Sequence, residues 1–214
     1  MLIGLGSGST AEAVVRSLGT RIAAGLRFNA VPTSERTAKL ARTCGLVLTT
    51  LDDVQTLDLG IDGADEIDPE LNLVKGRGGA LLWEKLVARA CERFVVVAAS
   101  EKLVDRLGTR VPLPVETVPF GWKQTVRRIE ALGCIATLRT GADNNSPFRT
   151  DEGNYIVDCV TGPLFEPASF DLALKAVTGV VDHGLFIDIA DQALTVDPDG
   201  HLSVRGPAAA QYHS

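Results

Sequence analysis

The stretch Leu2-Ile-Gly-Leu-Gly-Ser-Gly-Ser-Thr-Ala11 decides the fold. A short apolar run enters a glycine-rich turn, and the residues up to Arg21 then carry the apolar spacing of a helix. Glycines let the backbone approach an anion closely, and the start of a helix offers unpaired N–H groups. The stretch therefore predicts a first strand and a first helix with a phosphate site between them. The alternative is a tight turn that binds no ligand.

A dinucleotide site is a second alternative, because Gly6, Gly8 and Ala11 fit the loose fingerprint of that class. Such sites need an acidic residue about 20 positions further on, at the end of the next strand. Residues 28–34 contain no acidic side chain. We therefore favour a simple phosphate site.

Strands and helices alternate outward from this stretch through the first half of the chain. Helices are predicted from Thr33 or Ser34 to Gly45 and over 79–91, where Leu82, Leu86 and Ala90 form an apolar stripe. The predicted strands cover residues 2–5, 28–31, 46–51, 57–61 and 94–99. Such alternation is typical of α/β proteins. We expect a Rossmann-like parallel sheet with helices on both faces.

The pattern changes near Pro112. Three prolines in residues 111–119 remove ladder donors, so this segment is not expected to form a central strand. Helices are then predicted over 122–132 and 169–177, and strands over 134–139, 155–160 and 181–187. Two helices on an antiparallel sheet make a smaller α+β domain of ferredoxin-like type.

The chain is thus expected to form two domains. Residues 113–187 would form the smaller one, whose exposed strand edges suit a role in oligomerisation. Residues 1–112 and 188–214 would form the α/β domain. The tail has a hairpin pattern around Pro198-Asp-Gly200 and no predicted partner in the smaller domain, so we expect it to return to the first sheet.

Composition excludes several classes of protein. With 21 basic and 27 acidic side chains the formal charge is −6, which argues against a nucleic-acid partner. The longest apolar run covers only residues 94–99, whereas a membrane helix needs about 20 residues. The chain reaches its glycine turn too early to hold a leader, so we expect a cytoplasmic protein with no membrane partner. The cysteines lack CxxC spacing and the histidines lack metal spacing, which predicts reduced thiols and no bound metal.

An acidic segment, Asp62-Gly-Ala-Asp-Glu-Ile-Asp68, follows the predicted strand 57–61. The calcium-loop pattern fails, because Ala64 stands at its third position and Ile67 where glycine is required. Carboxylates at the carboxyl edge of a sheet suit hydrogen bonds to sugar hydroxyls. The alternative is an acidic turn that is merely solvated.

A glycine-rich lysine loop, Lys75-Gly-Arg-Gly-Gly79, opens the predicted helix that carries Glu84. Glu84 lies about 200° from Leu82 around that helix and should face away from the apolar stripe, towards solvent, a cleft or a neighbouring loop. Lys102 follows the strand 94–99 at the same sheet edge. Taken alone, Glu84 has the pattern of a solvated helix residue, but these segments converge on one edge.

These motifs occur in the same order in the A-type ribose-5-phosphate isomerases, which the sequence resembles over nearly its whole length. The shared motifs include Gly6-Ser-Gly-Ser-Thr10, Asp62-Gly-Ala-Asp-Glu66, Lys75-Gly-x-Gly-Gly79 with Glu84-Lys85, Ser100-x-Lys102 and Pro112-Leu-Pro-Val-Glu116. The resemblance implies interconversion of D-ribose 5-phosphate and D-ribulose 5-phosphate, without a metal or an organic cofactor, by a homodimer or homotetramer.

The resemblance also implies the site residues. Glu84 would be the catalytic base, which carries a proton between C1 and C2 through a cis-enediol. Lys75 and the loop amides would stabilise the enediolate oxygen, while Asp62 or Asp65 would assist ring opening. Lys102 and the first glycine turn would hold the phosphate. The residues expected to bind substrate are Ser7, Gly8, Ser9, Thr10, Asp62, Gly63, Ala64, Asp65, Lys75, Gly76, Arg77, Gly78 and Lys102.

Two departures from the family pattern accompany the resemblance. Family members usually carry a helix before the glycine turn, and here only three residues precede Gly4, so one face of the sheet is expected to be less covered. Arg77 stands where a small residue is common, and it would either contact phosphate or face water. The alternative functions are a non-catalytic sugar-phosphate sensor and a different isomerase or a deaminase of sugar phosphates.

Overall fold

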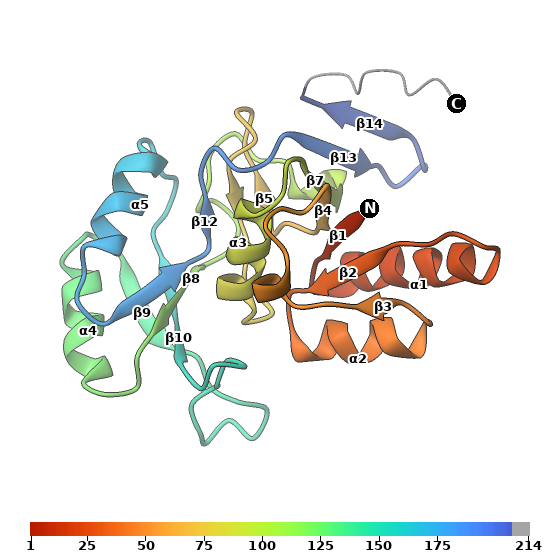
Figure 1. Ribbon diagram of the computed structural model, residues 1–214. Helices are drawn as coiled ribbons and strands as arrows, with labels where there is room; N and C mark the ends of the chain where they lie inside the picture. Colours follow the sequence, from red (N-terminus) through yellow and green to blue (C-terminus); the bar gives the residue numbers. More distant parts are fainter. Residues whose placement is uncertain (207–214) are drawn as a thin grey trace.

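A seven-stranded sheet forms the centre of the computed structural model, which describes residues 1–206; the end of the predicted α/β domain, with His213, lies outside them. The strand order is β14-β13-β7-β4-β1-β2-β3, and every neighbouring pair except β13 and β14 is parallel (Figure 1). The strands are β1 (Leu2–Leu5), β2 (Asn29–Pro32), β3 (Val47–Leu48), β4 (Leu59–Asp62), β7 (Phe94–Ala99), β13 (Gln192–Val196) and β14 (Leu202–Arg205). The predicted parallel sheet is confirmed, and the tail hairpin does return to it beside β7.

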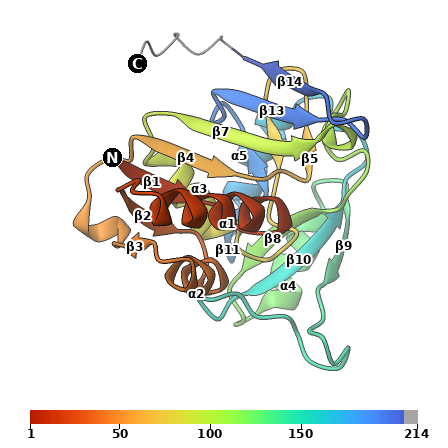
Figure 2. The same cartoon turned by 90° about the vertical axis from the view of Figure 1, so that its right-hand side faces the viewer.

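Helices cover both faces of this sheet, as predicted (Figure 2). Ile3 and Leu5 of β1 point to one face and pack in a core with α1 (Ser9–Ala23) and α2 (Glu35–Thr43). Leu2 points to the other face, where Val87 of α3 (Leu81–Arg89) lies. Side chains alternate along a strand, so the apolar residues of β1 reach both layers.

The ferredoxin-like unit follows. It contains β8 (Leu113–Thr117), α4 (Trp122–Glu130), β9 (Ile135–Leu138), β10 (Tyr155–Val160), α5 (Pro167–Lys175) and β11 (Val180–His183), with the antiparallel order β11-β8-β10-β9. The prediction that residues 111–119 form no central strand is wrong, because β8 pairs on both sides. Pro114 accepts from the Gly184 N–H, so its backbone nitrogen lies on the same side, just beyond the end of β11. The strand tolerates this proline because no ladder hydrogen bond is needed from that nitrogen.

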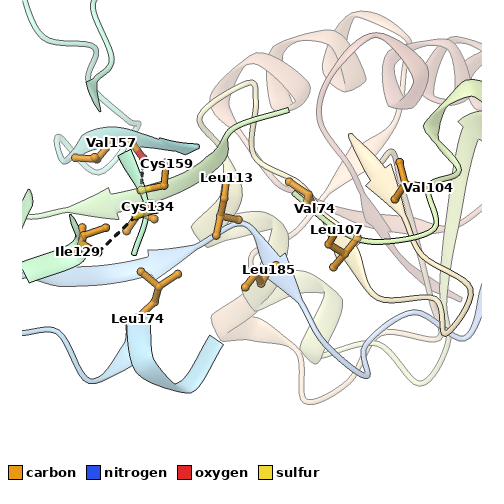
Figure 3. Close-up of a cluster of buried hydrophobic side chains, with 11 residues drawn as sticks. Val74, Val104, Leu107, Leu113, Ile129, Cys134, Val157, Cys159, Leu174 and Leu185 are labelled. Atoms are coloured by element: carbon orange, nitrogen blue, oxygen red, sulfur yellow. Dashed lines mark hydrogen bonds between the residues drawn. The ribbon is translucent and has the colours of Figure 1, made fainter. Parts of the chain in front are cut away.

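A small third sheet joins the two units. It has the order β12-β6-β5, formed by β5 (Glu66–Ile67), β6 (Leu73–Val74) and β12 (Leu185–Phe186). The single strand predicted over 181–187 is therefore wrong, since it breaks at Gly184 and its two halves join different sheets. One core runs from Cys134 and Cys159 of the ferredoxin-like unit to Val74 of β6 (Figure 3).

The strand predicted over 46–51 is also shorter in the structure. β3 lies at the sheet edge and has only β2 as a neighbour. The chain then leaves the sheet through a 3₁₀ turn, η1 (Leu51–Asp53), and a similar turn, η2 (Ser100–Lys102), follows β7. None of the helices in residues 1–206 has the length and apolar character needed to cross a membrane.

Candidate active site

The site lies where the strand order of the large sheet reverses, between β1 and β4. Ligands bind at this point in open parallel sheets, beyond the carboxyl ends of the strands. The Gly6 N–H donates to Ile61 O at 2.9 Å, and the Ser7 N–H donates to the Asp62 carboxylate at 3.0 Å. A Cβ on Gly6 would lie 2.0 Å from Asp62 Oδ1, so only glycine allows the turn to approach this carboxylate.

A cavity of about 340 Å³ opens above this point, and segments far apart in the sequence line it. The lining residues are Ser7, Gly8, Ser9, Thr10, Gly63, Ala64, Asp65, Lys75, Gly76, Arg77, Gly78, Glu84 and Lys102. Each of them was singled out from the sequence. Asp62, also expected in the site, does not line the cavity but lies buried beside Lys75.

Three charged side chains, Asp62, Lys75 and Glu84, form what we call the cavity cluster. Lys75 Nζ lies 2.9 Å from Asp62 Oδ2 and 3.2 Å from Glu84 Oε2, and it donates to Gly63 O at 2.7 Å. The side chains of Asp62, Lys75 and Glu84 are only 2%, 3% and 5% exposed. The cluster therefore holds two carboxylates and one ammonium away from bulk water.

The expected packed face of α3 is wrong, although Glu84 does face the cavity, one of the directions expected from the sequence. Leu86, placed on the packed stripe by the sequence, is exposed, whereas Leu81, Glu84, Lys85 and Ala88 are buried. Their spacing is that of one helix face. Glu84 thus lies on the packed side of α3 rather than opposite to it, because Lys75 provides it with a buried partner.

The charges of the cavity cluster determine which group can exchange a proton. Burial raises the pKa of Glu84 to about 8; the Lys75 ammonium opposes this shift and the Asp62 charge adds to it. Burial also raises the pKa of Asp62, against Lys75 and two backbone N–H groups. Burial would lower the pKa of Lys75, but the two carboxylates outweigh it and raise this pKa above its usual range. Glu84 is therefore a carboxylate able to gain and lose a proton near neutral pH.

Hydroxyl groups support the first glycine turn. Ser7 Oγ lies 2.8 Å from both Thr33 Oγ1 and Ser34 Oγ, and 3.2 Å from Thr37 Oγ1. Ser34 also caps α2, as expected, by accepting from the Thr37 N–H. Sequence analysis did not place Thr33, Ser34 and Thr37 beside the site. The signal that could have placed them there is the helix-capping pattern directly after β2, because β2 ends at the same edge of the sheet.

The lysine loop is held from two sides. The Arg77 N–H donates to Asp65 Oδ2 at 3.1 Å, and Arg139 of the ferredoxin-like unit donates to Arg77 O at 2.8 Å. Phe148 covers Gly79, where a Cβ would lie 2.4 Å from the ring. The exposed Arg77 side chain thus stands on a loop that is fixed through its backbone.

The acidic residues around the site are partnered rather than solvated. Glu66 is buried and accepts from the backbone N–H groups of Gly108, Arg110 and Val111. In the cavity cluster, Lys75 already occupies the place between the two carboxylates that a cation would need. Elsewhere, Asp197, Asp199 and His201 could each bring one ligand atom to a common point, on an exposed turn between β13 and β14.

The fold and the cavity define an α/β protein whose ligand site, at the switch point of a parallel sheet, is built around a buried lysine and two carboxylates. The sequence model of the family described as "Ribose 5-phosphate isomerase A (phosphoriboisomerase A)" matches residues 29–200. The chain belongs to the ribose-5-phosphate isomerase A family.

Individual relatives are similar over nearly their full length. Ribose-5-phosphate isomerase A of Synechococcus sp. (strain JA-3-3Ab) is 51% identical, with 96% of this chain and 90% of that protein covered. The Roseiflexus sp. (strain RS-1) protein of the same name is also 51% identical, with 99% and 91% covered. The solved structure of ribose 5-phosphate isomerase from Plasmodium falciparum has a TM-score of 0.92 at 37% identity, with 97% and 91% covered. Another, of a D-ribose-5-phosphate isomerase in complex with phospho-erythronic acid, has a TM-score of 0.93 at 35% identity, with the same coverage.

Proposed function

We propose that this chain interconverts D-ribose 5-phosphate and D-ribulose 5-phosphate, a step of the pentose phosphate pathway, with Glu84 as the general base. The observation that carries this assignment is the 3.2 Å contact between Glu84 and Lys75 at the wall of the cavity. A carboxylate beside a fixed ammonium is what proton transfer through an enediolate needs.

Glu84 takes the proton from C2 of the open-chain aldose and returns it to C1, while the proton of the C2 hydroxyl passes to the C1 oxygen. Its raised pKa suits this task, because a base works best when its pKa lies near the operating pH. When Glu84 takes the proton, its own negative charge is neutralised. An equal charge develops on the enediolate oxygen of the substrate. The Lys75 ammonium, held in place by Asp62 and Gly63 O, stabilises this charge without reorganising.

The two aspartates take different roles in this mechanism. Asp65 lines the cavity and can exchange a proton with a sugar hydroxyl as the ring opens. Asp62 lies outside the lining, where Oδ2 forms an ion pair with Lys75 and Oδ1 accepts from the Ser7 and Gly63 N–H groups. Asp62 thus orients Lys75 and links it to the first glycine turn.

The phosphate occupies the first glycine turn. Ser7, Gly8, Ser9 and Thr10 lie at the start of α1, whose unpaired N–H groups favour an anion. Lys102 lines the same cavity from the end of β7, and its side chain is 29% exposed. Binding energy from the phosphate then fixes the sugar against Glu84. A non-catalytic sensor is not supported, because the relatives are isomerases.

The test is an isomerase assay on ribose 5-phosphate with added chelator, comparing wild type with Glu84→Gln. We expect chelator-resistant turnover that falls by about 10³-fold or more in the variant, the upper range for a general base. Retained binding of phospho-erythronic acid by the variant, measured by calorimetry, shows that its site is intact. Near-wild-type turnover in Glu84→Gln would exclude Glu84 as the base.

We also propose that residues 113–187 form a domain distinct from residues 1–112 and 188–214, and that it mediates a homodimer or homotetramer. Exposed apolar side chains on this unit, Phe120, Ile135 and Leu172, support the assembly role. Light scattering tests it: Ile135→Lys and Leu172→Lys should dissociate the assembly.

We also propose a cytoplasmic location for the protein. Its four cysteines are unpaired, as is typical of proteins in a reducing compartment. Cell fractionation would test this location.

A further inference from the structure

A second group of charges, two of them buried, lies where α3 meets β11 and α5. We call it the junction cluster: Lys85 of α3, Asp182 of β11 and Lys175 of α5. Lys85 Nζ donates to Asp182 Oδ1 at 2.6 Å and to His183 O at 2.7 Å. Asp182 Oδ2 accepts from Lys175 Nζ at 2.6 Å, and Oδ1 also accepts from the His183 N–H at 2.7 Å. Both carboxylate oxygens are therefore occupied.

The cluster connects directly to the residues of the cavity cluster. Lys85 is the neighbour of Glu84 in the sequence, and both are buried on the same face of α3. Asp182 lies one residue before the end of β11, and the residues that follow this strand, 184–186, lie beside Lys75. A shift between α3 and this segment would change the distance between Glu84 and Lys75.

Lys75 rests on that segment through both its backbone and its side chain. The Lys75 N–H donates to Gly184 O at 2.8 Å, and a Cβ on Gly184 would lie 2.1 Å from Lys75 O. The buried ring of Phe186 has Lys75 Nζ at 5.4 Å and Lys85 Nζ at 5.0 Å from its centroid. One phenyl ring thus lies near Lys75 of the cavity cluster and Lys85 of the junction cluster.

Stability alone does not explain a buried ion pair at this place. Replacing such a pair by apolar or neutral groups of similar size is often neutral or stabilising, because desolvation offsets the attraction of the charges. What the pair supplies is direction: two hydrogen bonds from one ammonium fix α3 relative to Asp182 and His183. Apolar contacts alone would allow α3 to slide relative to Asp182 and His183.

We propose that Lys85 and Asp182 are positioning residues, which lock α3 to the segment 182–186 and so set the separation of Glu84 and Lys75. The proposal rests on the proposed role of Glu84. It gives the ferredoxin-like unit a part in positioning Glu84, because Asp182 belongs to that unit.

The test uses the double variant Lys85→Met/Asp182→Asn, which removes both charges and keeps an acceptor for the His183 N–H. Steady-state kinetics and thermal melting are compared with wild type. We expect a melting temperature within a few degrees of wild type, KM within threefold, and kcat lowered at least tenfold. Lys175→Met is the matched control. It removes the other lysine from the same carboxylate but leaves α3 tied, so its kcat should stay within twofold.

Three results would overturn the proposal. The first is a double variant with kcat within twofold of wild type. The second is an equal loss of kcat in Lys175→Met. The third is a double variant that does not fold, since the pair would then be needed for stability. Glu84→Gln, measured alongside, separates the two ideas: if it stays active the role of Glu84 fails, whereas if it is inactive and the double variant is active, only the positioning role fails.

Discussion

The cavity cluster and the junction cluster are built from the same kinds of side chain in opposite proportions. The first has two carboxylates and one ammonium, and the second has two ammonium groups and one carboxylate. In each cluster, a group of the kind in excess has its pKa shifted against its charged form. Burial raises the pKa of Glu84 to about 8, and burial, against Asp182, lowers the pKa of Lys85.

The difference teaches how adjacent residues of one helix acquire different tasks. Glu84 lines the cavity, so its carboxylate can exchange a proton with a substrate. Lys85 faces Asp182 and His183 O, which fix it in place. We therefore expect the surplus carboxylate beside the cavity to act as a base, and the surplus ammonium between the two units to fix the position of α3.

The largest effect is expected from Lys75→Met. It removes the only cation of the cavity cluster, so kcat/KM should fall by about 10³-fold through loss of the oxyanion partner. Two buried carboxylates would also lose their counterion, which should cost about 3 kcal/mol of unfolding free energy in urea titrations. Lys85→Met should cost less stability, because Asp182 keeps Lys175 and the His183 N–H as partners, and far less activity. Equal losses of activity in both variants would remove the distinction between the clusters.

The next largest effect is expected in the pH dependence of activity and stability, which depends on Glu84 of the cavity cluster. Glu84 must be deprotonated to act, so kcat/KM should rise tenfold per pH unit up to about 8 and then level off. Because this pKa is raised on folding, Glu84 favours the folded state most below about pH 4.5, and this contribution is lost as the pH rises to about 8. Wild type should therefore lose stability relative to Glu84→Gln over that range. Parallel melting curves of the two proteins from pH 5 to 9 would contradict the assignment.

A smaller effect is expected from Lys102→Ala, a cavity lysine that belongs to neither cluster. Loss of one charge-assisted contact to phosphate, about 1.4 kcal/mol, should raise KM about tenfold and leave kcat within threefold. Kinetics on ribose 5-phosphate measure this split. A fall in kcat with unchanged KM would place Lys102 at the reacting carbons instead.

The smallest effect is expected from Arg77→Ala. The side chain is exposed and the loop is held through the Arg77 backbone by Asp65 and Arg139, so kcat and KM should each change less than threefold. The same kinetic assay decides this. A tenfold rise in KM would show that the guanidinium contacts the phosphate.

The lining of the cavity could be predicted because its motifs are local. Glycine turns at strand ends and the start of α1 can be identified without knowing the tertiary packing, and parallel strands bring their carboxyl ends to one edge. The Rossmann-like sheet followed from the same alternation. The roles assigned to the lining residues stay predictions.

The parts that could not be predicted depend on partners distant in sequence. Glu84 and Lys85 are polar by composition, so the packed face of α3 was placed on Leu82 and Leu86; only Lys75 and Asp182 make their burial possible. The prolines of residues 111–119 likewise argued against a central strand, because the sequence does not show where β11 ends. The missing donor of Pro114 falls beside Gly184, where the ladder has stopped.

The most direct test of the central claim is a crystal structure of this chain with phospho-erythronic acid, whose carboxylate resembles the two oxygens of an enediolate. We predict its carboxylate on Lys75 Nζ, its adjacent carbon within about 3.5 Å of a Glu84 carboxylate oxygen, and its phosphate on residues 7–10 and Lys102. A phosphate bound at Lys75, or a Glu84 side chain turned away from the ligand carbons, would contradict the assignment of Glu84 as the base.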